Sequence, residues 1–315
     1  SGATPTQEMA YAFCIAKAYA DEVIRRGLPV DEFAGRLSYN FNIFGNIFEQ
    51  VAKFRAGRGL WAKIMKEQYG ATQPGSMWLR MIAGGGGGGL TAEQPENNIV
   101  RGAYYALISA LSGAQTMALC CFDEAYTIPS EYAQRLSLRT MQLLIEEMGL
   151  TDTADPLGGS YYIETLTNRM RDEMERIMAE VDADGGIVRQ VAEGRVQSQV
   201  SAQAYRRQRD IESGALRKVG INCYRSDEAE PERAVEFHPY NEADARAQIA
   251  AFARVRAGRD AAAVAQALAR VSADARAGAN LMPAVVEAVK AYASVGEITQ
   301  EMVKVFGRYR EPVRF

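Results

Sequence analysis

Six consecutive glycines, Gly84 to Gly89, constrain the fold of this chain more than any other stretch of its sequence. Because glycine lacks the β-carbon that restricts φ and ψ, each ordered glycine costs roughly 0.5 to 1 kcal/mol relative to alanine. Glycine-rich sequence is commonly a flexible linker. This run lies between an apolar, strand-like segment and a helical pattern, where linkers are rare. We therefore favour a second interpretation, in which the bare main chain closely approaches a bulky ligand.

Composition excludes several classes of protein. The chain has 315 residues and a net charge of -3. Its hydrophobic content of 48% is enough for a sizeable core in one large or two smaller domains. No basic block predicts nucleic-acid binding, and no apolar run of about 18 residues predicts a membrane span. The four cysteines are too few for a disulfide framework, and no targeting signal is visible in the first ten residues, so we expect a soluble protein of the reducing cytoplasm.

Short apolar segments alternate with longer helical patterns in the first half of the chain. After a first helix at 7–26, the expected strands are 35–41, 76–83 and 114–121, and the helices that follow them are 47–69, 97–111 and 129–148. This βα alternation predicts an α/β fold with a parallel sheet, and the continuous apolar runs predict that the sheet is buried on both faces. Ligands of such folds bind at the carboxyl ends of the strands, so residues 36–41, the glycine run and residues 120–125 are expected to be neighbours.

The second half of the chain is mostly helical in pattern. Helices are expected at 168–182, 185–193 and 197–213, a strand at 218–224, an acidic connector at 226–233, and amphipathic helices from Asn241 onward. We divide the chain into residues 1–150 (the β/α part), 151–225 (a helical scaffold with a short strand) and 226–315 (a helical C-terminal region). The single histidine, His238, lies beside Pro239 and is interpreted as structural rather than as a ligand.

Several motifs resemble a known family. They are RLSYNF at 36–41, LTAEQPENNIVR at 90–101, FDEA at 122–125 and DPLGGSYYIETLT at 155–167. Together they closely resemble the large catalytic subunit of the adenosylcobalamin-dependent acyl-CoA mutases, the methylmalonyl-CoA mutase family. That family builds an eight-fold β/α (TIM) barrel, threaded by coenzyme A and capped by the corrin at the carboxyl ends of its strands. The resemblance implies that this chain supplies the later β/α units, followed by a mostly helical region.

The resemblance also implies an activity and its requirements. The expected reaction is a radical carbon-skeleton isomerisation of an acyl-CoA, with adenosylcobalamin as cofactor. The match places Ser1 just after the strand that bears the family's tyrosine-histidine pair, so an N-terminal barrel portion is expected as a partner, and no catalytic residue is assigned here. The cobalamin signature Asp-x-His-x-x-Gly does not fit around His238, so a separate cobalamin-binding subunit or domain is also expected. The alternative is a non-catalytic binding or assembly module derived from a mutase.

Matching positions give a candidate site. For the substrate, the resemblance implies four residues that bind the acyl-CoA: Arg36, Leu37, Ser38 and Gln115. On the cofactor side it assigns Glu124, Ala125, Gly84, Gly86, Gly87, Asn40 and Cys120. Each of two residues has an alternative interpretation: Arg36 as a surface ion-pair residue, and Glu124 as an acidic residue favoured at a helix N-terminus.

Departures from the family pattern bear on the substrate. Gly84 replaces a glutamine, Ala118 and Cys120 replace a histidine and an asparagine, and Asn40 replaces an aromatic residue. The loss of these side chains predicts a wider cavity with fewer hydrogen-bonding groups, which argues against the usual methylmalonyl substrate. Cys120 and Cys121 are either a metal or redox pair or ordinary buried residues; adjacent cysteines without further ligands make a poor zinc site, so no metal is predicted.

Overall fold

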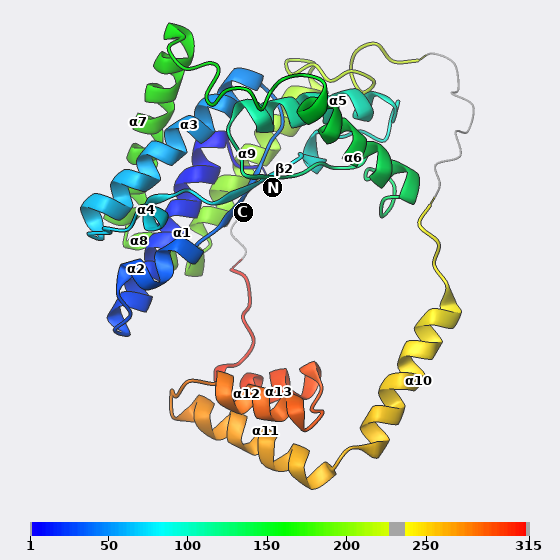
Figure 1. Cartoon of the computed structure of the whole chain (residues 1–315). Coiled ribbons are helices and arrows are strands. Elements are labelled where there is room, and N and C mark those ends of the chain that lie inside the picture. Colours follow the sequence, from blue (N-terminus) through cyan, green and yellow to red (C-terminus); the bar gives the residue numbers. More distant parts are fainter. Residues whose placement is uncertain (1, 227–236, 313–315) are drawn as a thin grey trace. The chain divides into compact units, whose positions relative to one another are not determined.

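The computed structural model describes residues 2–226 and 237–312, which fall into two compact units (Figure 1). The first comprises the chain up to His238 together with Pro312, and the second is Pro239–Glu311. Residues 151–225, predicted as a scaffold of their own, belong to the first unit. The predicted connector at 226–233 lies, except for Ser226, outside the described residues.

The first unit begins with two long helices that the apolar spacing had predicted. Helix α1 (Pro5–Arg25) starts at a capping box. The Thr4 hydroxyl accepts a hydrogen bond from the Gln7 main-chain N–H, and the Gln7 side-chain oxygen accepts one from the Thr4 main-chain N–H. Helix α3 (Ile47–Lys63) continues into a π-helical turn, η2 (Ile64–Gln68). The two helices lie side by side (Figure 1).

Three short parallel strands form the sheet, in the order β1-β2-β3. They are β1 (Tyr39–Asn42), β2 (Met81–Gly84) and β3 (Thr116–Ala118), connected by α3 and α5 (Asn97–Leu111). The predicted βα alternation is therefore confirmed, but all three strands are shorter than predicted and start later, the first two by four or five residues and β3 by two. Residues before the first two form helical turns instead: α2 (Val30–Phe33), η1 (Ala34–Arg36) and α4 (Pro74–Met77). Pro74 occupies the first turn of α4, a position that its fixed φ favours.

The sheet is covered on one face only. Side chains alternate between the faces of a strand, and Phe41, Met81 and Ala83 are buried on the face that packs on helices. An aromatic cluster fills that side, where the Tyr39 ring lies 5.3 Å from Trp61 and 5.6 Å from Phe13. On the other face Ile82 is 39% exposed. The prediction of a sheet buried on both faces was wrong for the described chain, because apolar runs do not reveal whether a second layer is present.

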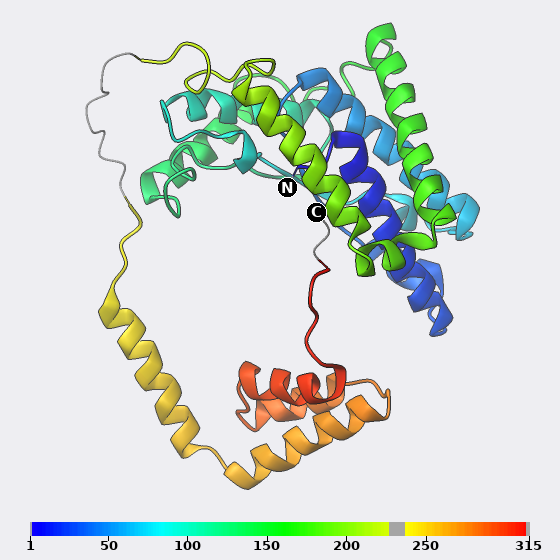
Figure 2. The ribbon, with the colours of Figure 1, turned by 180° about the vertical axis from the view of Figure 1, so that it is seen from behind.

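The remaining helices of the first unit were largely predicted. They are α6 (Glu131–Glu146), α7 (Tyr161–Ala183), α8 (Gly186–Ala192) and α9 (Arg195–Glu212). Helix α7 packs against α1 and α3, and α9 runs beside α1 (Figure 2). The Tyr11 hydroxyl of α1 donates a hydrogen bond to Gln199 of α9. These contacts build one helical layer behind the covered face of the sheet.

The strand predicted at 218–224 is absent from the first unit. The segment is a turn with an isolated bridge between Val219 and Cys223. The Asn222 side chain accepts the Lys218 N–H at 2.7 Å and donates to the Leu216 carbonyl at 2.8 Å. Because these bonds take up main-chain groups that a strand would offer to a neighbour, the apolar segment curls back on itself.

The second unit is helical, as predicted for this region. It contains α10 (Glu242–Gly258), α11 (Ala261–Arg276), α12 (Met282–Lys290) and α13 (Val295–Phe306). Val271 and Ala284 are fully buried between α11 and α12, and Arg259 pairs with Glu297 through two hydrogen bonds. No helix within residues 2–226 and 237–312 has the length and apolarity needed to cross a bilayer.

Candidate functional site

The glycine run follows β2 directly and lies against the loop after β3. Gly84 ends the strand, and the Gly85 N–H donates to the Ala118 carbonyl at 2.6 Å. Gly86 has a φ of 59°, in the left-handed region that favours glycine, and Gly87–Gly89 form a single helical turn, η3. The run is therefore an ordered loop at the carboxyl edge of the sheet.

Three of the six glycines are required by the packing of the loop itself. A β-carbon at Gly85 would lie 2.8 Å from the Cys120 nitrogen, one at Gly86 2.2 Å from the Ile43 carbonyl oxygen, and one at Gly89 2.2 Å from the Tyr105 hydroxyl. Such distances are shorter than real β-carbon contacts. Gly86 was predicted as a cofactor residue. The structure gives it a packing function, which that prediction did not foresee.

Two other glycines leave space open. A β-carbon at Gly88 would meet no atom within 4 Å, and one at Gly87 would make ordinary contacts, at 3.7 Å from the Cys120 sulfur and 3.9 Å from Oε2 of Glu124. Both residues are exposed. At Gly84 the space for a side chain is tight but not closed, because a β-carbon there would lie 3.3 Å from Oδ1 of Asn40. The middle of the run thus presents main chain without side chains to the space outside the loop.

The loop after β3 holds Glu124 beside the glycine run. Oε1 of Glu124 accepts the Cys121 N–H at 2.9 Å, which fixes the exposed carboxylate. Buried Asp123 accepts the Ser130 N–H at 2.9 Å, and the Asn98 amide donates to the Phe122 carbonyl at 3.0 Å. Sequence analysis did not single out Asp123 or Asn98 as positioning residues, although both lie within the quoted motifs. Ala125 is exposed on the same turn.

The two adjacent cysteines of this loop remain thiols. Burial, followed by the charge and hydrogen bond of Glu124, raises the pKa of Cys120 to about 12. Burial likewise raises the pKa of Cys121 to about 11. A raised pKa disfavours the thiolate that nucleophilic chemistry and metal binding require. Nor do any three His, Cys, Asp or Glu side chains cluster as metal ligands in the part of the chain that the structure describes.

The predicted substrate residues lie at the opposite edge of the sheet. Arg36, Leu37 and Ser38 precede β1, and Gln115 precedes β3. The Gln115 amide accepts the Met81 N–H at 3.1 Å and donates to the Leu79 carbonyl at 3.3 Å, so it joins the beginnings of β2 and β3. The expectation that residues 36–41 would neighbour the other two loops was therefore wrong for Arg36 to Ser38. In a parallel sheet, residues before a strand and residues after a strand lie at opposite edges.

A buried ion pair fixes the carboxyl end of β1. Lys53 of α3 is 1% exposed, and its Nζ donates to Oε2 of Glu8 at 2.9 Å and to the Asn42 carbonyl at 2.7 Å. The other Glu8 oxygen accepts the Asn42 N–H at 2.8 Å. Burial lowers the pKa of Lys53, and the Glu8 carboxylate opposes that shift. Sequence analysis missed this pair, because nothing in the sequence indicates that residues 8 and 53 meet.

Proteins of similar sequence identify the family of this chain. The family model described as methylmalonyl-CoA mutase matches residues 1–308. The chain belongs to the methylmalonyl-CoA mutase family. It is 41% identical over 312 residues to the 2-hydroxyisobutanoyl-CoA mutase large subunit of Aquincola tertiaricarbonis, covering 99% of this chain and 55% of that protein. It is also 40% identical over 314 residues to a methylmalonyl-CoA mutase of Cereibacter sphaeroides, covering 100% of this chain and 44% of that protein. The chain thus spans about half the length of these relatives.

The open face of the sheet carries a row of residues at the carboxyl ends of the three strands. Asn42, Gly84 and Ala118 are register partners and form one row across the three strands. Both Asn40 and Asn42 point to this face, because their Oδ1 atoms would lie 3.3 and 3.8 Å from a β-carbon at Gly84. Asn42 was not predicted as a site residue; strand alternation from Asn40 is the signal that identifies it.

Proposed function

We propose that this chain forms the later β/α units of a TIM barrel in an adenosylcobalamin-dependent acyl-CoA mutase. An N-terminal barrel portion completes the barrel, and a cobalamin-binding subunit or domain joins it. Three observations support this assembly: the strands are parallel, the outer edges of β1 and β3 pair with no other strand among the described residues, and one face of the sheet is uncovered. Natural sheets rarely leave such edges free.

The observation that carries the proposal is the separation of the two predicted residue sets. The substrate set lies at the amino edge of the sheet, and the cofactor set lies at the carboxyl edge or on the open face between them. A coenzyme A chain that enters at the amino edge and runs along the open face reaches the cofactor at the other end. This is the order of ligands that the family resemblance implies.

At the amino edge, Arg36 and Ser38 are both exposed and available to a ligand. A guanidinium offers a fixed fork of donors that suits phosphate or carbonyl oxygens, and the Ser38 hydroxyl adds one more donor. Half-buried Leu37 anchors the segment between them. Gln115 positions the neighbouring strand through its two main-chain hydrogen bonds.

At the carboxyl edge, the residues present fit a bulky ring ligand. Gly87 and Gly88 offer main chain without side chains, so a flat group can approach the loop closely. Glu124 keeps Oε2 beside that space while Oε1 holds the Cys121 N–H, and its oxygens can accept ribose hydroxyl protons. Ala125 and Cys120 flank it. When bound, adenosylcobalamin supplies the radical chemistry of the carbon-skeleton isomerisation. The protein residues bind and orient the ligands and exclude water from them.

The open face supports a substrate other than methylmalonyl-CoA. Gly84 and Ala118 present almost no side chain in their row, and the amides of Asn40 and Asn42 are uncharged. This lining leaves room for a branched acyl group and offers hydrogen bonds rather than a counter-ion for a carboxylate. We therefore propose a branched, uncharged acyl-CoA as the substrate class.

Reconstitution tests the proposal. The full chain is combined with the polypeptides that carry the N-terminal barrel portion and the cobalamin domain, and with adenosylcobalamin. Isomerisation of a panel of acyl-CoA thioesters, methylmalonyl-CoA included, is followed by mass spectrometry. We expect turnover, fastest with a branched, uncharged acyl group. Fastest turnover of methylmalonyl-CoA would contradict the substrate class. Assembly without turnover or cobalamin binding would support a non-catalytic module instead.

A further inference from the structure

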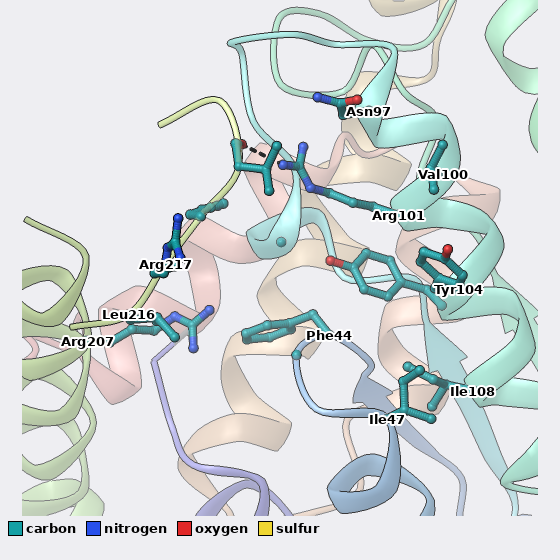
Figure 3. Close-up of a pocket in the computed structure, with 15 residues that line it drawn as sticks. Phe44, Ile47, Asn97, Val100, Arg101, Tyr104, Ile108, Arg207, Leu216 and Arg217 are labelled. Atoms are coloured by element: carbon teal, nitrogen blue, oxygen red, sulfur yellow. Dashed lines mark hydrogen bonds between the residues drawn. The ribbon is translucent and has the colours of Figure 1, made fainter. Parts of the chain in front are cut away.

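A cavity of about 500 Å³ lies beyond the carboxyl end of β1, next to the last residue of the glycine run, because Phe44, Gly45 and Gly89 line it. One wall is the outer side of α5, the opposite wall is α9 with the turn that follows it, and Phe44 and Ile47 form the floor (Figure 3). A cavity of this size accommodates a ligand of roughly nucleotide size. None of the predicted site residues lines it.

Positive charge gathers on one side of this cavity. Arg101, Arg207, Arg217 and Lys218 all line it, and no Asp or Glu does so among the described residues. Burial, and after it the nearby charges of Arg101 and Arg207, lowers the pKa of Lys218, so both arginines lie close enough to Lys218 to repel its charge. The acidic residue whose charge reaches Lys218 is Glu93.

The hydrogen bonds of these cations go to neutral groups. Arg101 donates to the Thr91 hydroxyl at 2.7 Å and to the Val219 carbonyl at 2.9 Å, while Nζ of Lys218 lies 3.4 Å from the Leu90 carbonyl oxygen. The Arg207 guanidinium lies 5.0 Å from the centre of the Phe44 ring. Within residues 2–226 and 237–312, none of these three cations forms an ion pair with a carboxylate. Their charge is therefore available to an anion.

The other side of the cavity is apolar and partly open to solvent. Tyr104 is 55% exposed and Val100 52% exposed, and both project from α5 toward the cavity (Figure 3). Ile108 and Leu216 extend the same lining. Large apolar side chains exposed beside a group of uncompensated cations indicate a ligand that joins a flat apolar body to an anionic group.

We propose that this cavity binds a nucleoside phosphate, with the phosphate groups at Arg207 and Lys218 and the base against Tyr104 and Val100. A polyphosphate carries several negative charges and suits this group of four cations, whereas a single carboxylate leaves most of them uncompensated. Guanidinium groups also grip phosphate oxygens with two donors at once, and every nucleobase offers a face for stacking on an aromatic ring. The residues of this site differ from those predicted for the mutase site, and its test does not depend on that proposal.

Calorimetric titration of the full chain with ADP tests the proposal without any partner or turnover. We expect saturable binding that weakens when the salt concentration is raised, because the contacts are ionic. Adenosine and inorganic phosphate each carry half of the ligand, and both are expected to bind at least about tenfold more weakly than ADP.

Four variants locate the site. Arg207→Met removes a charge without leaving a buried partner unpaired, and it should weaken ADP binding about tenfold. Tyr104→Leu keeps an apolar wall without the ring and should weaken ADP but not inorganic phosphate. Arg209→Met is the matched control on the exposed side of α9, and Arg36→Met tests whether ADP has bound at the proposed coenzyme A edge. Neither of these two should change the affinity for ADP.

Several outcomes would overturn the proposal. They are no binding of ADP at millimolar concentration, equal binding of ADP and adenosine, equal binding of ADP and inorganic phosphate, and equal losses in Arg207→Met and Arg209→Met. A loss confined to Arg36→Met would show that ADP occupies the amino edge of the sheet instead. Thermal unfolding of each variant separates lost binding from lost folding.

Discussion

The two edges of the sheet are built in different ways. At the carboxyl edge the loops meet main chain to main chain, with the Gly85 N–H bonded to the Ala118 carbonyl and Gly86 pressed against Ile43. At the amino edge, exposed side chains such as Arg36 carry the predicted contacts and make few bonds within the chain. An edge made of main chain tolerates little substitution, because backbone atoms cannot move aside. An edge made of side chains can lose binding without losing its fold.

The largest effect is expected at the tightest glycine. In Gly86→Val the new side chain would clash with the Ile43 carbonyl and force a β-branched residue into a left-handed conformation. We expect a loss of about 3 kcal/mol or more in the free energy of unfolding. Denaturant unfolding of the full chain measures it. If Gly86→Val were as stable as wild type, the glycine run would be looser than the structure shows.

Gly88 provides the contrasting case. Gly88→Val should leave the free energy of unfolding within about 1 kcal/mol of wild type, because its β-carbon would meet open space. In the reconstituted enzyme we expect the same variant to weaken adenosylcobalamin at least about tenfold. Gly88→Ala, with a smaller side chain, should have an intermediate effect. Unchanged cofactor affinity in both variants would show that the space above the glycine run is not used.

The carboxylate beside that space gives a more selective loss. Glu124→Ala should weaken adenosylcobalamin about tenfold in the assembled enzyme and spare hydroxocobalamin, which has no ribose at the upper face. Glu124→Gln retains an oxygen for the Cys121 N–H and should lose less. Equilibrium titration of the cobalamin absorbance checks both ligands. Equal losses for the two cobalamins would indicate a distorted loop rather than a lost ribose contact.

At the amino edge we expect binding and folding to separate. Arg36 is exposed and forms no ion pair within the described residues, so Arg36→Ala should leave thermal stability unchanged and raise the KM for acyl-CoA about tenfold. Gln115→Ala should instead destabilise the chain by about 1 to 2 kcal/mol, because it removes two hydrogen bonds that join β2 to β3. Steady-state kinetics and unfolding curves of both variants are the measurements. A normal KM in Arg36→Ala would remove it from the substrate site.

The smallest effect concerns the thiol at the carboxyl edge. With a pKa of about 12, Cys120 is protonated throughout the neutral range, and about one thiol in 10,000 is ionised at pH 8. Alkylation by iodoacetamide should therefore be slow at pH 8 and accelerate about tenfold for each unit of pH. Glu124→Gln removes a negative neighbour, which lowers the pKa of Cys120 and speeds alkylation. Peptide mass spectrometry measures both; fast labelling in the wild type at pH 8 would contradict the raised pKa.

The helices were the most predictable part of the fold. Residues 97–111 were predicted as a helix, and α5 has the same bounds. Its apolar spacing indicates the buried face of the helix, and Ser112-Gly113 indicates where the helix ends. The strands were predicted less well, since apolar residues before β2 are also compatible with the helical turn that Pro74 starts. The strand predicted at 218–224 failed because the Asn222 side chain bonds Lys218 and Leu216 within the same turn, and the apolar residues of the segment do not reveal these bonds.

The sequence by itself determined the βα order, the family and the six glycines as an unusual feature. Only the tertiary structure decided what each glycine does: Gly85 and Gly86 allow loops to touch, Gly89 makes room for the Tyr105 side chain of α5, and Gly87 and Gly88 face open space. It also placed Arg36 and Gln115 at the edge opposite to Glu124. The physical reason is the same in both cases. The space around a residue depends on atoms contributed by other strands, and the identity of the residue alone does not specify their distance.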